Sequence, residues 1–142
     1  MRTARFSEQA AYLGGINPAS HSTEQNTGYL SLANYHRAVV IIHCGVIGGN
    51  LDVDFEEATD TSASGAQSFN SAGKDIAKTA TTDNNTISII EIDCDELDIA
   101  DGYDCLNVEV TPASAGIFGV QVWGLEPRYA PVATSNVDSI TD

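Results

Sequence analysis

The stretch "VIIHCGVIGGNLDVDFEEATDTSASG", residues 40–65, decides the fold class of this chain. Its first part belongs to the run "HRAVVIIHCG", residues 36–45, in which β-branched residues stand side by side and a glycine ends the pattern. Such a run predicts a β-strand that is apolar on both sides. We therefore expect this strand to lie in the middle of a sheet.

The second part, "NLDVDFEEA" at residues 50–58, alternates with a period of two. Leu51, Val53 and Phe55 fall on one face of the expected strand and the acidic side chains fall on the other. Because "GVIGGN" joins this strand directly to the preceding one, we expect the two to pair as an antiparallel hairpin. The outer face of the hairpin would then be almost entirely carboxylate.

The rest of the chain continues the β pattern. Residues 59–75 read as a long loop or as a segment with one short edge strand, and 75–85 could add a strand. The run "TISIIEIDCDEL" at 86–97 alternates with a slip at Ile90 that suggests a β-bulge or a strand changing sheets. Two further strands are expected over 105–112 and 115–128. Five to eight strands without a long helix favour an all-β fold, a single antiparallel β-sandwich of the jelly-roll kind.

Residues 1–35 lack sustained periodicity and are rich in Ser, Asn, Gly and Gln, with scattered apolar residues. We interpret this segment as an extended N-terminal arm that orders against a partner, followed by the sandwich domain over 36–132 and a C-terminal tail over 133–142. At 142 residues the chain suits one domain.

The charge is strongly acidic, with 20 Asp and Glu against 6 Lys and Arg and a formal net charge of -14. Nucleic acid and anionic membrane surfaces would repel such a chain, so we expect neither as a partner. The three cysteines, Cys44, Cys94 and Cys105, stand at no framework spacing and are interpreted as buried free thiols of a protein made in a reducing cytosol.

The acidic segment "EIDCDELDIADGYD", residues 91–104, is the strongest candidate for a cation site, because hard cations bind closely spaced carboxylate oxygens. It does not match the calcium-loop template, so we interpret it as a solvated acidic face, with weak cation binding at "DIADGYD" as the lesser alternative. The histidines match no metal-ligand spacing, and His43 and Cys44 should point to opposite faces of a strand. We predict no metal, no cofactor and no catalytic residue, and therefore no enzyme.

Three segments carry a resemblance to a known group of proteins: "YLSLANYHRAVVIIHCGVIGGNLDVDFEEATDTSASGA", "ELDIADGYDCLNVEVTPA" and "GLEPRYAPV". Together they make the chain from Tyr29 to Val132 similar to small structural proteins encoded among the virion genes of tailed bacteriophages. The shared features are the Tyr-His-Arg entry at 35–37, "EATD" at 57–60, the "ELDI…GYD" turn and "EPRY" at 126–129. The middle loop aligns only through Lys74-Asp75-Ile76.

The resemblance implies a non-enzymatic virion component, a head decoration or cement protein with a β-sandwich fold, often clustered as trimers on the capsid. Its partner would be the major capsid protein, and it would be made in the bacterial host cytoplasm and reside on the capsid surface. A neck, fibre or tail position stays open.

For such a protein we predict that contacts to the shell are made by the arm and its entry, with apolar contacts and arginine ion pairs from Arg2, Arg5, Phe6, Tyr12, Leu13, Tyr29, Tyr35 and Arg37. The alternative is a carbohydrate- or cation-dependent binding module that would use Trp123, Tyr103 and the carboxylates of Asp98, Asp101 and Asp104.

Overall fold

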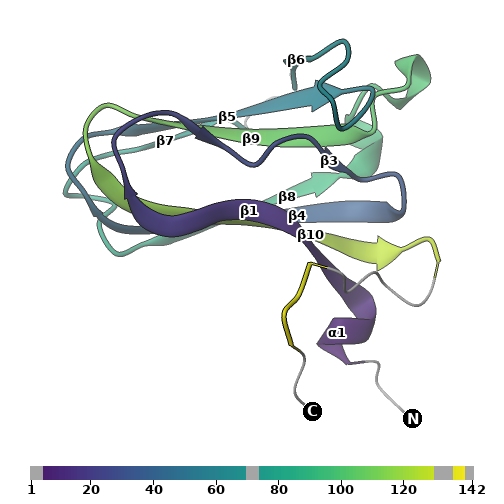
Figure 1. The fold of residues 1–142 in the computed structure, drawn as a ribbon, viewed down its shortest axis with the longest axis horizontal. Helices are drawn as coiled ribbons and strands as arrows, with labels where there is room; N and C mark the ends of the chain where they lie inside the picture. Colours follow the sequence, from purple (N-terminus) through teal and green to yellow (C-terminus); the bar gives the residue numbers. More distant parts are fainter. Residues whose placement is uncertain (1–4, 70–73, 130–135, 140–142) are drawn as a thin grey trace.

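The computed structural model describes residues 5–69, 74–129 and 136–139, and β-strands account for most of this part of the chain (Figure 1). One short helix, α1 (Phe6–Gln9), comes first. The strands in chain order are β1 (Ala10–His21), β2 (Gln25–Asn26), β3 (Leu30–Ser31), β4 (Tyr35–Ile47), β5 (Leu51–Ala58), β6 (Gln67–Ser68), β7 (Ile76–Lys78), β8 (Ile87–Asp93), β9 (Cys105–Pro112) and β10 (Gly116–Pro127). Two 3₁₀ turns, η1 (Cys94–Glu96) and η2 (Ile99–Asp101), join β8 to β9. Among the described residues, no helix has the length and apolar character needed to cross a bilayer.

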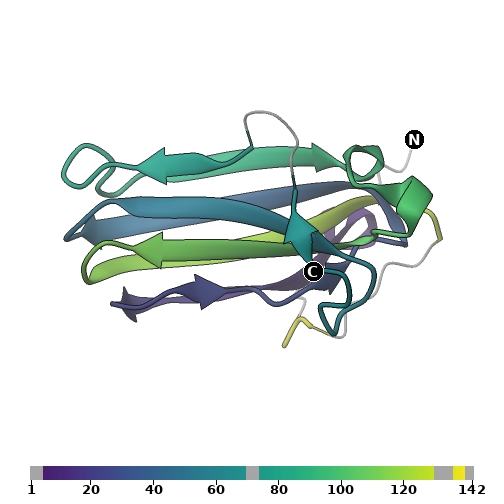
Figure 2. The same cartoon turned by 90° about the horizontal axis from the view of Figure 1, so that it is seen from above.

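The strands form two stacked antiparallel sheets, as Figures 1 and 2 show from two directions. Sheet A has the order β1-β10-β4-β8. Sheet B has the order β2-β9-β5-β6, with β3 also pairing with β9 and β7 also pairing with β5. The two inner faces enclose the core, and each sheet presents its other face outward.

The strand order is that of a jelly roll. If β2 with β3 and β6 with β7 each count as one interrupted strand, the chain crosses between the sheets at almost every connection. Numbered along the chain, the successive strands then lie 1-8-3-6 in sheet A and 2-7-4-5 in sheet B. This double Greek key confirms the expected jelly-roll sandwich.

The expected hairpin between β4 and β5 was wrong, because the two strands lie in different sheets. The Gly48–Gly49 corner carries the chain from sheet A to sheet B and runs beside the connection from β9 to β10. There the Gly48 amide donates to the Ala115 carbonyl at 3.0 Å, and the Ala113 amide donates to the Asn50 carbonyl at 2.8 Å. A Cβ on Gly48 would lie 2.5 Å from the Ala115 carbonyl oxygen, so the close approach of the two connections requires glycine.

The N-terminal segment also differs from the expected arm. β1 pairs with β10 along the edge of sheet A, and Ala11, Ile16 and Leu32 are buried in the core. The segment showed no periodicity because β1 has register shifts between Tyr12 and Gly14 and again between Ile16 and Ala19. The structure thus places residues 10–35 within the sandwich.

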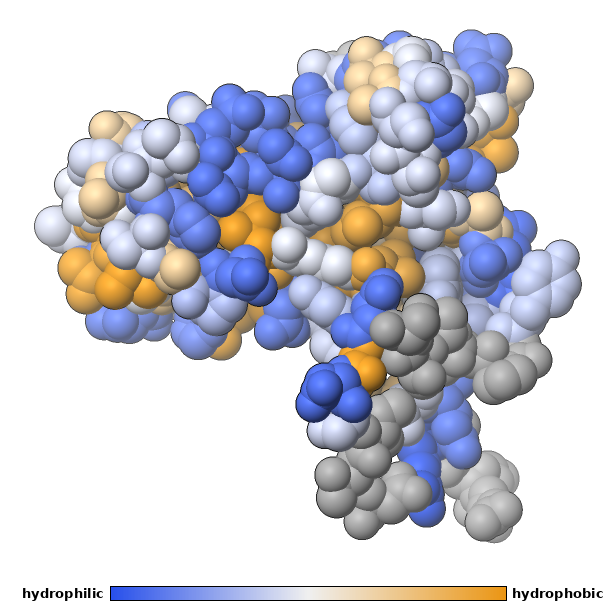
Figure 3. All heavy atoms as spheres, viewed as in Figure 1, coloured by the Kyte–Doolittle hydropathy of each residue, from blue (hydrophilic) through white to orange (hydrophobic). Residues whose placement is uncertain are grey.

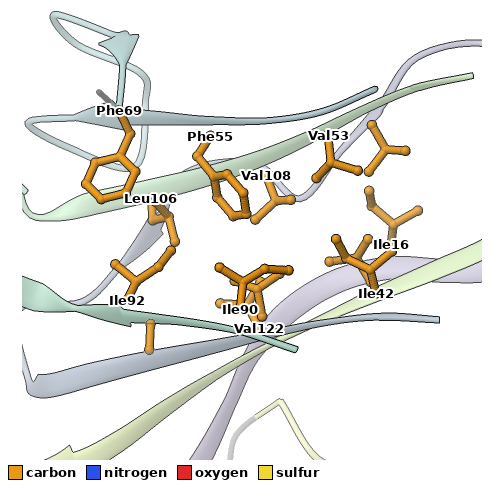
Figure 4. Packing of buried hydrophobic residues seen from close by; sticks show 14 of the residues in the cluster. Ile16, Ile42, Val53, Phe55, Phe69, Ile90, Ile92, Leu106, Val108 and Val122 are labelled. Carbon is orange, nitrogen blue, oxygen red and sulfur yellow. The ribbon is translucent and has the colours of Figure 1, made fainter. Parts of the chain in front are cut away.

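The core lies between the two inner faces (Figure 4). Sheet B and the residue after β6 supply Val53, Phe55, Phe69, Leu106 and Val108, which point toward Ile16, Ile42, Ile90, Ile92 and Val122 of sheet A. Each such side chain contributes about 1.5–3 kcal/mol when fully buried. Cys44, Cys94 and Cys105 are buried free thiols, as expected.

The predicted C-terminal tail lies mostly outside the described residues. Within 136–139, the Asn136 side-chain amide donates to the backbone carbonyls of Tyr12 at 3.3 Å and Leu13 at 3.0 Å. This contact ties the segment to the first strand of sheet A.

Candidate interaction surfaces

The outer face of sheet B is acidic. Asp52, Asp54 and Glu56 of β5 point away from the core, as the alternation predicted, while Leu51 and Val53 point into it. In the register between β5 and β9, the carboxylates of Asp54 and Glu109 stand directly opposite each other. We call the set Asp52, Asp54, Glu56 and Glu109 the acidic face.

Burial, with the charges of neighbouring carboxylates, raises pKa values on the acidic face. Burial, reinforced by the charges of Asp75, Asp52 and Glu56, raises the pKa of Asp54. The pKa of Glu109 is raised by burial first and then by Glu24, Glu56 and Asp54. The face therefore stores electrostatic repulsion that a basic partner surface would relieve.

Tyr29 is held by this face instead of standing free for a partner. Its hydroxyl donates to Glu56 Oε2 at 2.7 Å, and the Asn107 side-chain amide donates to the same oxygen at 3.0 Å. Burial and the Glu56 carboxylate raise the pKa of Tyr29 to about 12. The phenol therefore stays protonated and buttresses β5 against β9 at physiological pH.

The outer face of sheet A has the opposite character. Successive cross-strand rows place Tyr12, Trp123 and Val39 together, then Gln121, Ile41 and Ile89, then Gly119, His43 and Ile87. Ile87 and Ile89 are 58% and 64% exposed, large fractions for isoleucine in a strand. We call these nine residues the apolar face.

The apolar face accounts for the slip seen at Ile90. β8 pairs with β4 without interruption from Ile87 to Asp93, so the expected bulge or change of sheet was wrong. Ile90 and Ile92 point into the core while Ile87 and Ile89 point outward. The alternation slipped because the outer positions change from isoleucine to acid along the strand. The adjacent isoleucines Ile89 and Ile90, one facing outward and one facing the core, were the sequence signal for a strand with apolar side chains on both faces.

A hollow of about 260 Å³ lies in the apolar face. Gly119 and Pro18 line the hollow on one side, and Ile41, His43 and Ile87 line it on the other. A Cβ on Gly119 would lie 3.0 Å from the Pro18 Cα, which shows how closely β1 approaches β10 here. The exposed His43 and the buried Cys44 point to opposite sides of β4, as predicted.

An aromatic cluster stands at the other end of the same face. The Trp123 ring contacts the Phe6 ring at a centroid distance of 5.2 Å and the Tyr12 ring at 5.4 Å. The Trp123 indole N–H donates to Gln121 Oε1 at 3.0 Å. The cluster fixes α1 against sheet A and leaves Phe6 65% exposed.

A charged group borders this end. The Arg37 guanidinium lies 3.3 Å from Asp93, 3.8 Å from Glu126 and 4.0 Å from Glu91. Arg37 is thus shared among three carboxylates of its own chain, and these raise its pKa.

The remaining predicted contact residues have separate roles in the fold. Tyr35 is buried with its ring against Gly124, Leu13 packs partly buried against the core, and the Arg5 amide donates to Glu8 Oε2 at 2.9 Å. Arg2 lies outside the described residues. The structure brings together Phe6 and Tyr12 but not Tyr29 or Tyr35, and sequence reasoning missed the isoleucines of the apolar face.

The alternative ligand site is not assembled. Trp123 lies on sheet A, whereas the Tyr103 hydroxyl donates to the Gly65 carbonyl at 3.0 Å beyond the end of β5 in sheet B. Among the residues that the structure describes, no cluster of three or more potential ligands could hold a metal ion.

No protein-family model matches the chain and no curated protein matches it. Among solved structures, a chain of the cowpea mosaic virus empty virus-like particle is 10% identical with a TM-score of 0.45, covering 98% of this chain and 95% of that one. The tobacco streak virus coat protein is 9% identical with a TM-score of 0.42, covering 98% and 100%. PirA is 13% identical with a TM-score of 0.35, covering 82% and 89%. All three TM-scores are below 0.5, so the jelly-roll assignment rests on the strand order of the two sheets.

Proposed function

We propose that this protein is a structural component of a virion, specifically a decoration or cement protein on the head of a tailed bacteriophage. The observation that carries the proposal is the division of chemistry between the two outer faces of one sandwich. The acidic face suits water or a basic surface, and the apolar face suits burial against protein. The motif resemblance that runs from Tyr29 to Val132 points to the capsid surface as the location.

In this function the protein works as a clamp. Copies that bind only the assembled shell stabilise it by mass action, because every bound copy adds binding free energy to the assembled state. We propose the major capsid protein as the partner and a small homo-oligomer, such as a trimer, as the unit that binds. No residue has a catalytic role and no cofactor is needed.

The acidic face is assigned to the shell contact on the basis of its stored repulsion. Asp54 and Glu109 oppose each other, and neither is neutralised by a cation among the described residues. Lysine or arginine side chains on the shell would pair with these carboxylates, and such pairing is screened by salt.

Cosedimentation with phage heads that lack the protein tests the proposal. We expect the bound copies to match the number of lattice sites at low salt and to decrease at high salt. The doubly neutralised variant Asp54→Asn/Glu109→Gln should bind more weakly, whereas Asp101→Asn with Asp138→Asn removes the same charge elsewhere and should bind normally. A few copies per particle would move the protein to the neck, fibre or tail, contradicting decoration, and no binding at all would overturn the virion proposal.

A further inference from the structure

Two features of sheet A are complementary and lie on the same side of the molecule. One is the knob formed by α1, where Phe6 projects from the Trp123 and Tyr12 rings. The other is the hollow over Gly119. Figures 1 and 3 show α1 standing off the sheet A side at one end of the sandwich. Gly119 and Trp123 are four residues apart on β10, so the hollow begins about 13 Å along the strand from the knob.

The hollow has the size and lining for one apolar side chain. Its volume of about 260 Å³ is below the range of roughly 300–1,000 Å³ that is typical of small-molecule pockets. Ile41, Ile87 and Pro18 supply apolar walls. An aromatic anchor that enters such a site is the usual centre of a protein interface.

Charge decides which protein can cover this face. Copies with a net charge of -14 repel one another, and a group of carboxylates without a cationic partner in the described residues lies on the acidic face of sheet B. If two copies meet through sheet A, the acidic faces are separated by two sandwiches and an interface, about 30 Å at roughly 10 Å per layer. That distance is several Debye lengths at physiological salt, where the Debye length is about 8 Å.

A basic partner has a better site elsewhere. The acidic face attracts a cationic surface, whereas at the border of the apolar face the carboxylates of Glu91, Asp93 and Glu126 already pair with Arg37. The centre of the apolar face carries uncharged side chains and His43, consistent with the depletion of charge at interface centres. A second copy of this chain is therefore the occupant that fits.

We propose that copies of this protein associate through the apolar face, with Phe6 of α1 in one copy seated in the Gly119 hollow of a neighbouring copy. Each copy offers both the knob and the hollow, so the contact serves equally in a reciprocal pair or around a closed ring. This inference rests on the homo-oligomer of the proposed function and is independent of the shell partner.

Analytical ultracentrifugation with point variants tests the contact. We expect the wild-type chain of 15.0 kDa to sediment as a pair or a trimer. Phe6→Ala and Ile87→Lys should each weaken association by roughly thirtyfold or more, the loss typical of an interface hot spot. The matched control is Ile99→Lys, which places the same charge on an isoleucine that is 47% exposed in η2. Near-native circular dichroism of all variants separates lost association from lost folding.

Chemical cross-linking shows whether the contact runs between copies. At a protein concentration high enough to offset the weaker association of a Phe6 variant, a mixture of Phe6→Cys and Ile87→Cys under mild oxidation should yield a covalent dimer that contains one of each. A mixture of Phe6→Cys and Ile99→Cys should not, and the native thiols are buried in both.

A monomeric wild type, or association that survives Phe6→Ala and Ile87→Lys, would overturn the inference. A monomer that still binds heads would leave the proposed decoration role intact, whereas an oligomer that ignores heads would overturn only that role.

Discussion

Neutralising Asp54 should stabilise the folded protein. Asp54 stands directly opposite Glu109 in the ladder between β5 and β9, and the charges of Asp75, Asp52 and Glu56 add to the repulsion. Replacement by asparagine keeps the shape of the side chain and removes the charge. The folded state should gain more than the unfolded state, in which these carboxylates are far apart.

The expected gain follows from the strand geometry. Side chains directly opposite in an antiparallel pair have Cβ atoms about 5 Å apart, and two like charges at that distance in water repel by about 0.8 kcal/mol. We therefore expect Asp54→Asn to raise the free energy of unfolding by about 0.5–1 kcal/mol at pH 7. With an unfolding entropy of about 2.1 cal/mol/K per residue, this corresponds to about 2–3 °C in Tm.

The pH dependence has a definite sign. Because the pKa values of Asp54 and Glu109 are raised in the folded state, that state binds more protons between the unfolded and folded pKa values. The contribution of these groups to stability is therefore largest below the unfolded pKa of about 4 and falls as pH rises through the folded pKa. The advantage of Asp54→Asn should accordingly vanish near pH 3 and be full at pH 7.

Urea unfolding at pH 3 and pH 7, each at low salt and in 1 M NaCl, measures these differences. At about 3 Å, the Debye length in 1 M salt is shorter than the separation of the pair, so most of the gain at pH 7 should disappear. Asp138→Asn removes one charge from an exposed position near the C-terminus and serves as the control. No stabilisation by Asp54→Asn at low salt, or an equal effect of Asp138→Asn, would refute the reasoning.

Three further predictions test the fold. Leu32→Ala should destabilise the isolated protein by about 2–5 kcal/mol in urea unfolding, because Leu32 is 1% exposed in the core; a change below about 0.5 kcal/mol would restore the arm interpretation. Gly124→Ala should cost about 1–3 kcal/mol, since its Cβ would lie 2.6 Å from the Tyr35 ring, and an unchanged unfolding midpoint would contradict that packing. Burial, the largest cause in both cases, raises the pKa of Cys94 to about 11 and of Cys105 to about 12, so iodoacetamide at pH 8 should label them in urea and leave them unmodified in the folded state; rapid native labelling would show that they are accessible.

The sequence by itself determined the all-β class and the orientation of β5. Alternation from Leu51 to Glu56 depends only on the two-residue period of an extended chain, so it assigned the acidic face without knowledge of any partner strand. Buried cysteines were equally readable, because each sits within an apolar or alternating run.

The pairing of the strands could not be predicted from the sequence in this way. β4 and β5 are neighbours in sequence and were expected to form a hairpin, yet each finds its partners in a different sheet. The choice between a hairpin and a crossing corner depends on what else competes for the strand edges, and β10 and β9 supply those edges from distant parts of the sequence. Local turn residues such as Gly48 and Gly49 fit either outcome.

The interaction surfaces, too, were predictable from the sequence only in part. The sequence identified Phe6 and Tyr12 as candidate contacts, but their meeting with Trp123 requires the long-range pairing of β1 with β10. It placed Ile87 and Ile89 on a broken pattern, and only the sheet shows that Ile87 borders a hollow that Gly119 also lines. A period of two tells which residues share a face, whereas the neighbours that face each other across strands are set by tertiary packing.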